Sequence, residues 1–88
     1  MLKLIVEFLG TMLLSFVIFS SGGNYIAIGV ALAVAILLGG RISGAAYNPA
    51  IAIAMFYAKK LSVTDLVPYI IAEIAGGVAG YEVFKMIV

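Results

Sequence analysis

Few residues of this sequence could do chemistry, and none of them forms a familiar catalytic or metal-binding set. Glu7, Glu73 and Glu82 lie far apart in the chain, and the sequence contains neither Cys nor His. Thiolate and imidazole groups are common nucleophiles, general bases and transition-metal ligands in proteins. We therefore expect no metal site, no cofactor and no enzymatic activity.

A stronger signal is the tripeptide Asn48-Pro49-Ala50. Asn is a favoured N-cap residue and Pro fits the first helical position, so a helix should begin here. The apolar run after it ends at about Ala58, before two lysines. That leaves roughly ten residues, about half a membrane thickness, which is typical of a re-entrant or interfacial helix rather than a spanning one.

The composition places these residues in a membrane protein. Of the 88 residues, 66% are hydrophobic and only 10% are charged, with a mean hydropathy of +1.30. A soluble domain this small would need more polar surface, because small folds bury a modest fraction of their area. The net charge of +1, with no basic cluster, argues against an acidic partner and against nucleic acid. The expected surroundings are membrane lipids, around an integral multi-pass protein.

The hydrophobic stretches are long enough for three crossings. No charged residue occurs from Phe8 to Gly40, a run too long for a single helix across a hydrocarbon core of about 30 Å. Residues 20–24 are rich in Ser and Gly and predict a turn within that run. The predicted spans are residues 2–20, 25–40 and 66–88.

The borders of these spans leave two alternatives open. Lys3 followed by an apolar run also fits a secretory signal peptide, although Glu7 lies inside the would-be hydrophobic region. The polar linker over residues 59–65 precedes the third span, and either Thr64 or Asp65 is the expected helix cap.

The segment from Gly39 to Tyr47 is rich in small residues and predicts irregular backbone ahead of the short helix. Such backbone is tolerated at membrane depth only when it is buried in protein or lines a wet cavity, because lipid offers it no hydrogen bonds. The prediction is an all-α membrane protein of one unit, residues 1–88. It has three transmembrane helices and a re-entrant loop and half-helix over residues 41–58.

Residues 43–50 read Ser-Gly-Ala-Ala-Tyr-Asn-Pro-Ala and resemble the Ser-Gly-Ala-x-x-Asn-Pro-Ala signature of the major intrinsic proteins, the aquaporins and aquaglyceroporins. Residues 7–11 resemble that family's first-helix Glu-Phe-x-Gly-Thr. Residues 72–76 resemble its third-helix Ala-Gln-x-x-Gly, with Glu73 replacing Gln. Family members carry two such repeats in inverted orientation. This chain is similar to the first, because the Arg that usually follows the second Asn-Pro-Ala is absent after Ala50.

The resemblance implies a passive channel for water or small neutral solutes. In the family fold two half-helices meet N-terminus to N-terminus at the bilayer midplane, where Asn48 would cap one helix and donate its amide into the pore. The positive helix ends would repel cations and prevent a proton relay. One alternative is that Asn48 is only a helix cap. Another is a non-conducting small membrane protein that assembles with or modulates a full-length channel.

The resemblance also implies four supports of the pore loop, which are Glu7, Ser43, Gly44 and Glu73. Glu7 would accept backbone N–H bonds from the loop, which would offset a cost of about 2.5–3.5 kcal/mol for a central charge facing lipid. The alternative is a solvated Glu at the membrane interface. Glu73 lies deeper in its span and must be protonated or partnered, and Arg41 is the one cation considered for it.

Alignment to the family without gaps places one candidate filter side chain at Ile28. In an inverted dimer the other filter positions fall on three residues of the second copy, which are Ile36, Ala45 and Ile51. Such aliphatic groups would give a constriction with almost no hydrogen-bond donors, so the pore would be poorly selective or would dewet. The alternative is that these are ordinary lipid-facing or core residues.

Four glycines are candidates for helix packing. Gly76 and Gly80 lie four residues apart, a spacing that permits close helix contact in lipid. Gly10 and Gly29 could receive neighbouring helices in the same way.

A single half-helix does not make a pore, so the chain should have a partner half. The economical partner is a second copy in the opposite orientation, possibly gathered into a higher assembly of such dimers. The basic residues are divided four against one between the two sides, which predicts one orientation and disfavours dual insertion. They are Lys3, Arg41, Lys59 and Lys60 against Lys85. A separate second-half chain is therefore the alternative partner.

Overall fold

A computed structural model describes all residues, 1–88, and contains four helices and no strands. The helices are α1 (Leu2–Ser20), α2 (Tyr25–Ser43), α3 (Pro49–Tyr57) and α4 (Val63–Ile87). Three of them, α1, α2 and α4, are long and apolar enough to cross a membrane. The molecule is 39 Å along its longest axis, which exceeds a hydrocarbon core of about 30 Å. The all-α prediction of three spans and one short helix is confirmed.

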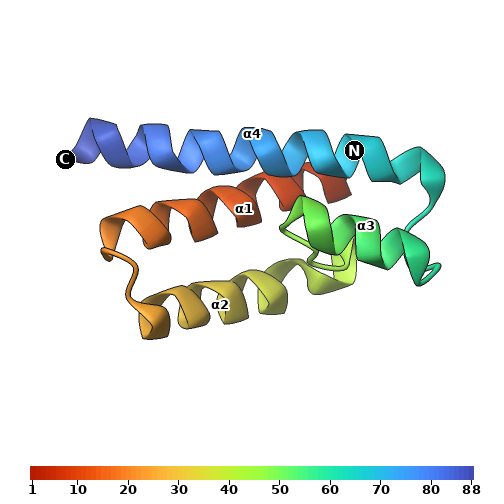
Figure 1. The fold of residues 1–88 in the computed structure, drawn as a ribbon, viewed down its shortest axis with the longest axis horizontal. Coiled ribbons are helices and arrows are strands. Elements are labelled where there is room, and N and C mark those ends of the chain that lie inside the picture. The colour runs from red at the N-terminus through yellow and green to blue at the C-terminus, as the bar shows by residue number, and fades with distance from the viewer.

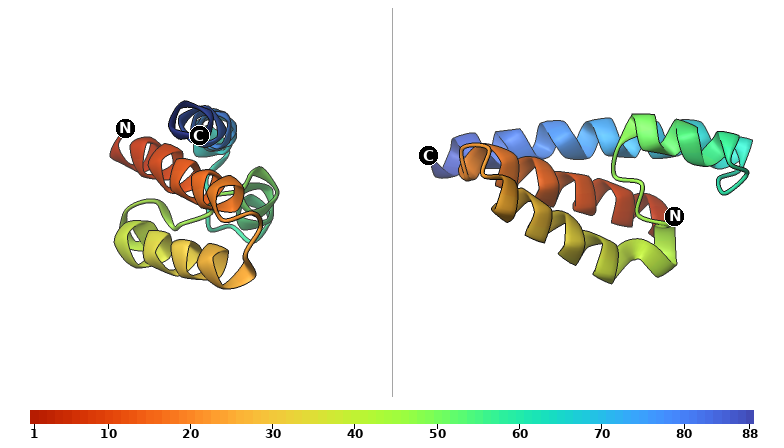
Figure 2. Two further views of the ribbon diagram at one scale, coloured as in Figure 1. Left: turned by 90° about the vertical axis from the view of Figure 1, so that its left-hand side faces the viewer. Right: turned by 60° about the horizontal axis from the view of Figure 1, so that its bottom comes forward.

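The central helix of the arrangement is α1, which packs along α4 on one side and against α2 on the other. The short helix α3 packs mainly on α4, and α2 packs mainly on α1. After α2 the chain turns back toward the middle of the molecule, and α3 then runs outward to the end at which α1 begins (Figures 1 and 2). The loop and α3 therefore enter and leave at the same end, which is a re-entrant path.

Two element borders differ from the sequence predictions. The second helix continues to Ser43, so the irregular segment is only Gly44–Tyr47 and not the whole stretch from Gly39. Gly44 ends α2 in the left-handed conformation with φ of 84°, where a residue without Cβ is favoured. The cap of α4 is Ser62, whose Oγ accepts from the backbone N–H of Asp65, so the expected cap at Thr64 or Asp65 was wrong.

The long α1–α4 contact depends on two glycines of α4. A Cβ atom on Gly76 would collide with the backbone carbonyl oxygen of Phe8, and one on Gly80 with that of Met12. The close approach also lets the Ser15 hydroxyl donate to the Gly77 carbonyl oxygen at 2.7 Å. In lipid, where apolar side chains gain little by leaving the solvent, this close backbone packing is a main source of helix association.

Substituting Gly76 with Ala should therefore lower the free energy of unfolding by about 1–3 kcal/mol, because the rigid backbone of α1 has to move. Thermal unfolding in detergent micelles, followed by circular dichroism, measures the change. Gly29→Ala is the matched control, since a Cβ there meets no atom within 4 Å. Equal stability of the two variants would contradict the role of the α1–α4 contact.

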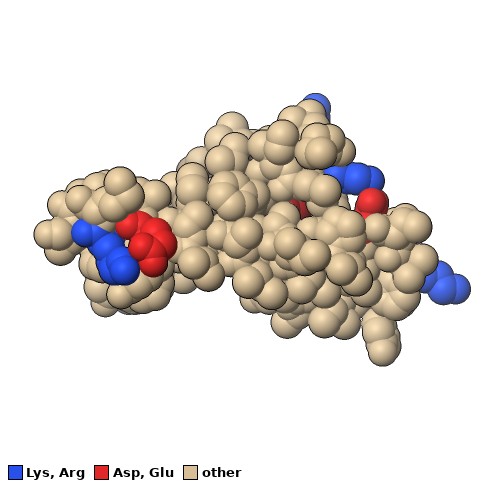
Figure 3. Space-filling view, turned by 90° about the horizontal axis from the view of Figure 1, so that it is seen from above, with Lys and Arg blue, Asp and Glu red and all other residues tan.

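The exposed charged side chains lie toward the two ends of the long axis, with mostly apolar surface between them (Figure 3). Lys3 Nζ and Asp65 Oδ2 form an ion pair at 2.6 Å that joins the first turns of α1 and α4. At the opposite end Lys85 lies 3.4 Å from Glu82 and 5.4 Å from the centre of the Tyr81 ring. This distribution fits a molecule with its long axis across the bilayer and its charges at the two interfaces.

Candidate pore loop and half-helix

The site is built around the start of α3. Asn48 has extended backbone (φ −161°, ψ 127°), and its side-chain Oδ1 accepts from the backbone N–H of Ala50 at 2.7 Å. Pro49 occupies the first turn, where its missing N–H costs nothing. The Asn48 side chain is exposed, and its amide nitrogen donates to no group of the protein. The residue that caps the helix thus retains free donors beside the positive helix end.

The four residues before it hold an unusual backbone. Gly44, Ala45 and Tyr47 all have positive φ, at 84°, 56° and 53°. For residues with a Cβ the left-handed conformation costs about 1–2 kcal/mol each, so this loop needs outside support to persist.

That support comes from Glu7 of α1, which is fully buried. One carboxylate oxygen accepts from the Ser43 hydroxyl at 2.6 Å and from the Ala46 backbone N–H at 3.2 Å. The other oxygen accepts from the Tyr47 backbone N–H at 2.8 Å. Hydrogen bonds to a carboxylate are about twice as strong as those between neutral groups. A single side chain from another helix therefore satisfies the inner donors of the loop, and the contact rules out a solvated, interfacial Glu7.

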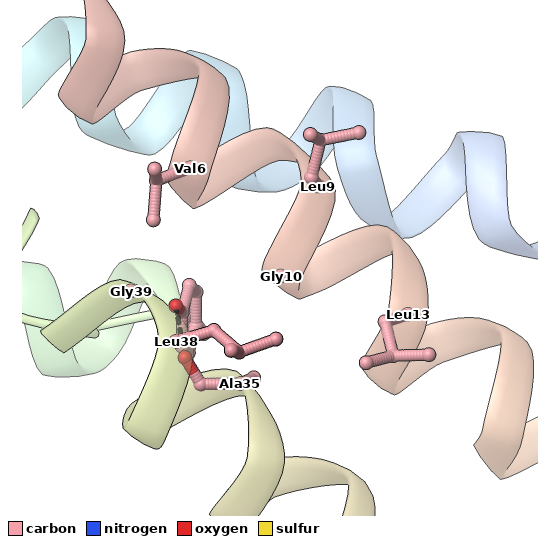
Figure 4. A pocket seen from close by; sticks show the side chains of 8 residues that line it. Val6, Leu9, Gly10, Leu13, Ala35, Leu38 and Gly39 are labelled. Atoms are coloured by element: carbon pink, nitrogen blue, oxygen red, sulfur yellow. Dashed lines mark hydrogen bonds between the residues drawn. The ribbon is translucent and has the colours of Figure 1, made fainter. Parts of the chain in front are cut away.

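The Tyr47 side chain is a second anchor, which sequence reasoning missed. It is buried against Gly10 of α1 and Gly39 of α2, where a Cβ on either glycine would overlap the phenol ring or its hydroxyl. Its hydroxyl donates to the Ala35 carbonyl oxygen at 2.6 Å. A mostly apolar groove of about 230 Å³ lies beside it between α1 and α2 (Figure 4).

Ser43, the last residue of α2, joins the loop to α1 and to α4. Its hydroxyl donates to Glu7 and accepts from the Ala45 backbone N–H at 3.1 Å. Its carbonyl oxygen, at the C-terminus of α2, accepts from the Tyr69 hydroxyl of α4 at 2.7 Å. Tyr69 is buried and was also missed, because a single Tyr in an apolar span gives no sequence signal for a distant carbonyl partner.

Glu73 of α4 is the most unusual residue of the site. It is 1% exposed, and neither carboxylate oxygen has a hydrogen-bond partner of ordinary geometry. Glu73 lies one turn before Gly76 on the face of α4 that packs on α1, and the Lys3–Asp65 and Phe8–Gly76 contacts place it level with the buried Glu7 of α1. Arg41, the cation considered for it from the sequence, is exposed and forms no ion pair, so that pairing was wrong.

The remaining candidates do not converge within one chain. Ile36 and Ile51 are each 47% exposed, Ile28 and Ala45 are partly buried, and none of the four lines a groove. Among the glycines, Gly76 and Gly80 receive α1, whereas Gly10 receives the Tyr47 ring rather than a helix. Gly29 faces open space.

A buried carboxylate on the first span therefore holds an irregular loop, which leads into a half-length helix capped by Asn48. The sequence matches the Major intrinsic protein family over residues 22–88. The chain belongs to this family. Members of the family are channels rather than enzymes. This chain is an integral membrane protein, because three of its helices are long and apolar enough to cross a membrane.

Three relatives are similar to most of this chain. The glycerol uptake facilitator protein-like 6 of Lactiplantibacillus plantarum is 35% identical over the whole chain, which covers 44% of that relative. Aquaporin AqpM of Methanothermobacter marburgensis is 39% identical over 70% of the chain and 27% of its own length. Aquaporin Z of Photorhabdus laumondii is 30% identical over 97% of the chain and 43% of its own length. The chain thus spans less than half of these relatives, and no solved structure matches it.

Proposed function

We propose that this major intrinsic protein is one half of a passive membrane channel for water and small neutral solutes, completed by a second half in inverted orientation. The free amide of Asn48 carries the proposal. It is exposed at the N-terminus of a nine-residue helix that reaches only part-way across the membrane. Lipid cannot satisfy a polar donor at that depth, so water or another polypeptide has to lie beside it. A pore lumen provides this environment.

The electrostatics of α3 suit neutral solutes. Its N-terminus carries roughly half a positive charge, and no acidic side chain lies in its first turn. Cations are repelled at this point, while a neutral solute can accept a hydrogen bond from the Asn48 amide. The names of the relatives refer to glycerol uptake and to aquaporins, which supports the same class of solute.

The partner half accounts for the uncovered sides of α2 and α3. Each packs mainly on one neighbouring helix, and the loop between them is partly exposed at Gly44 and Ala45. A second copy related by a two-fold axis in the membrane plane would place another α3 opposite the first. In that dimer Ile28 of one copy and Ile36, Ala45 and Ile51 of the other would form an aliphatic constriction. We expect such a pore to pass glycerol at least as readily as it passes water.

A separate second-half polypeptide is the second candidate partner. The observation that favours it is the unequal charge of the two ends, since a strong excess of basic residues at one end selects a single orientation. The two candidates predict different behaviour of the chain when it is alone.

Stopped-flow swelling of liposomes that contain only this purified chain tests the proposal under water and glycerol gradients. We expect flux above that of empty liposomes, and a severalfold reduction in Asn48→Asp. The aspartate keeps the cap acceptor for Ala50 but removes the amide donors and adds a negative charge.

Asn24→Asp is the matched control, because Asn24 also caps a helix by accepting a backbone N–H, that of Ala27, but lies at the opposite end of α2 from the loop. It should leave the flux unchanged. Flux that is insensitive to Asn48→Asp would contradict the pore role of Asn48. Absence of flux with folded protein would reject the homodimer and leave the separate second half as the partner to be tested by co-reconstitution.

A further inference from the structure

The Glu73 carboxyl group differs from Glu7 and Ser43 because it forms no hydrogen bond within the protein. It is buried in the middle of a spanning helix, and both of its oxygens lack a hydrogen-bond partner of ordinary geometry. An unpaired buried charge is among the costliest groups in a membrane protein. The group is therefore either neutral or neutralised by something beside it.

The buried carboxyl of Glu7 has the hydrogen-bond partners of a carboxylate. Its oxygens accept three hydrogen bonds, from the Ser43 hydroxyl and from the backbone N–H groups of Ala46 and Tyr47. A proton on either oxygen would compete with these donors, whereas a carboxylate accepts all of them.

No cation is placed to neutralise a second carboxylate. Lys3 is paired with Asp65 and Lys85 with Glu82. The other three basic residues are exposed, and they are Arg41, Lys59 and Lys60.

The buried tyrosine hydroxyls already donate to other groups. Those of Tyr47 and Tyr69 donate to backbone carbonyls and not to Glu73. Two adjacent buried carboxyl groups with one negative charge between them are the arrangement that remains.

We propose that Glu7 and Glu73 form a buried proton-binding site, in which Glu73 holds the proton and donates its O–H to Glu7. Glu73 is then a positioning residue for the pore loop, acting on it through Glu7, whose oxygens hold the loop. The inference deepens the proposed channel function and rests on it only for the flux measurements.

Infrared spectroscopy of the reconstituted protein at neutral pH tests the proton directly. We expect the C=O stretching band of a protonated carboxylic acid in the wild type and its loss in Glu73→Gln. The ion-paired acids Asp65 and Glu82 contribute carboxylate bands instead. A wild type without the acid band, or a band that persists in Glu73→Gln, would overturn the proton site.

Flux and folding measurements test the positioning role. Gln is neutral and can donate to Glu7 as the protonated Glu73 does, so Glu73→Gln should conduct within about twofold of the wild type. Glu73→Ala lacks this donor and should lose about tenfold, measured per folded protein by circular dichroism. A Glu73→Gln variant as impaired as Glu73→Ala would overturn the positioning role.

The two proposals fail in different ways. The infrared band is independent of transport, so a wild type with the band but no flux would reject the homodimeric channel and retain the proton site. Flux without the band would retain the channel and reject the proton site.

Discussion

Replacing Glu7 with Gln should lower the free energy of unfolding by about 3 kcal/mol, although the two side chains have nearly the same shape. One oxygen of Glu7 accepts from the Tyr47 backbone N–H and the other from Ala46 and Ser43. An amide has only one acceptor oxygen. In either orientation its NH2 group would face a buried backbone N–H, and that donor would lose its partner where water does not replace it.

Thermal unfolding in micelles measures this effect, with Glu82→Gln as the matched control. Glu82 is exposed at the far end of α4, so its substitution should change the free energy of unfolding by no more than about 0.5 kcal/mol. The ratio of water to glycerol flux through the protein that does fold should be preserved in Glu7→Gln, since Glu7 contacts the inner side of the loop. A variant of wild-type stability with an altered flux ratio would contradict the support role of Glu7.

Local rules allowed the short helix to be predicted from the sequence. The cap at Asn48 and the first-turn Pro49 depend on neighbouring residues only, and the lysines after Ala58 limit the length. The same rules failed at Ser62, because Ser, Thr and Asp occur together in the linker and propensity alone does not rank them. The end of α2 was set too early because Gly39 and Gly40 weaken a helix in isolation, whereas here the missing Cβ atom of Gly39 admits the Tyr47 hydroxyl.

Contacts between distant segments could be predicted from the sequence only in part. The family resemblance implied that Glu7 and Glu73 support the loop, but it did not indicate that both are buried at the same level of the α1–α4 contact. Nor does any spacing rule link Tyr47 to Gly10, because their proximity arises from how α1, α2 and the loop converge in space. The filter candidates stay predictions, since the chain alone does not bring Ile28 and Ile51 to a common groove.

The Tyr47 anchor yields the second large effect. Tyr47→Ala should lower the free energy of unfolding by about 3–5 kcal/mol, because a buried ring is removed from between two helices. Tyr47→Phe keeps the ring and should cost about 1 kcal/mol, since only the bond to the Ala35 carbonyl is lost and that oxygen also lies within the α2 ladder. Tyr57→Ala is the control, because the Tyr57 side chain is 80% exposed.

A double-mutant cycle between Tyr47 and Gly10 separates this contact from general loss of packing. Gly10→Ala should destabilise the wild type, because its Cβ would overlap the phenol ring, yet cost little in the Tyr47→Ala background, where the ring is absent. The expected coupling is about 1–3 kcal/mol, measured from the unfolding of the four proteins. Additive effects would mean that the ring does not occupy the space at Gly10.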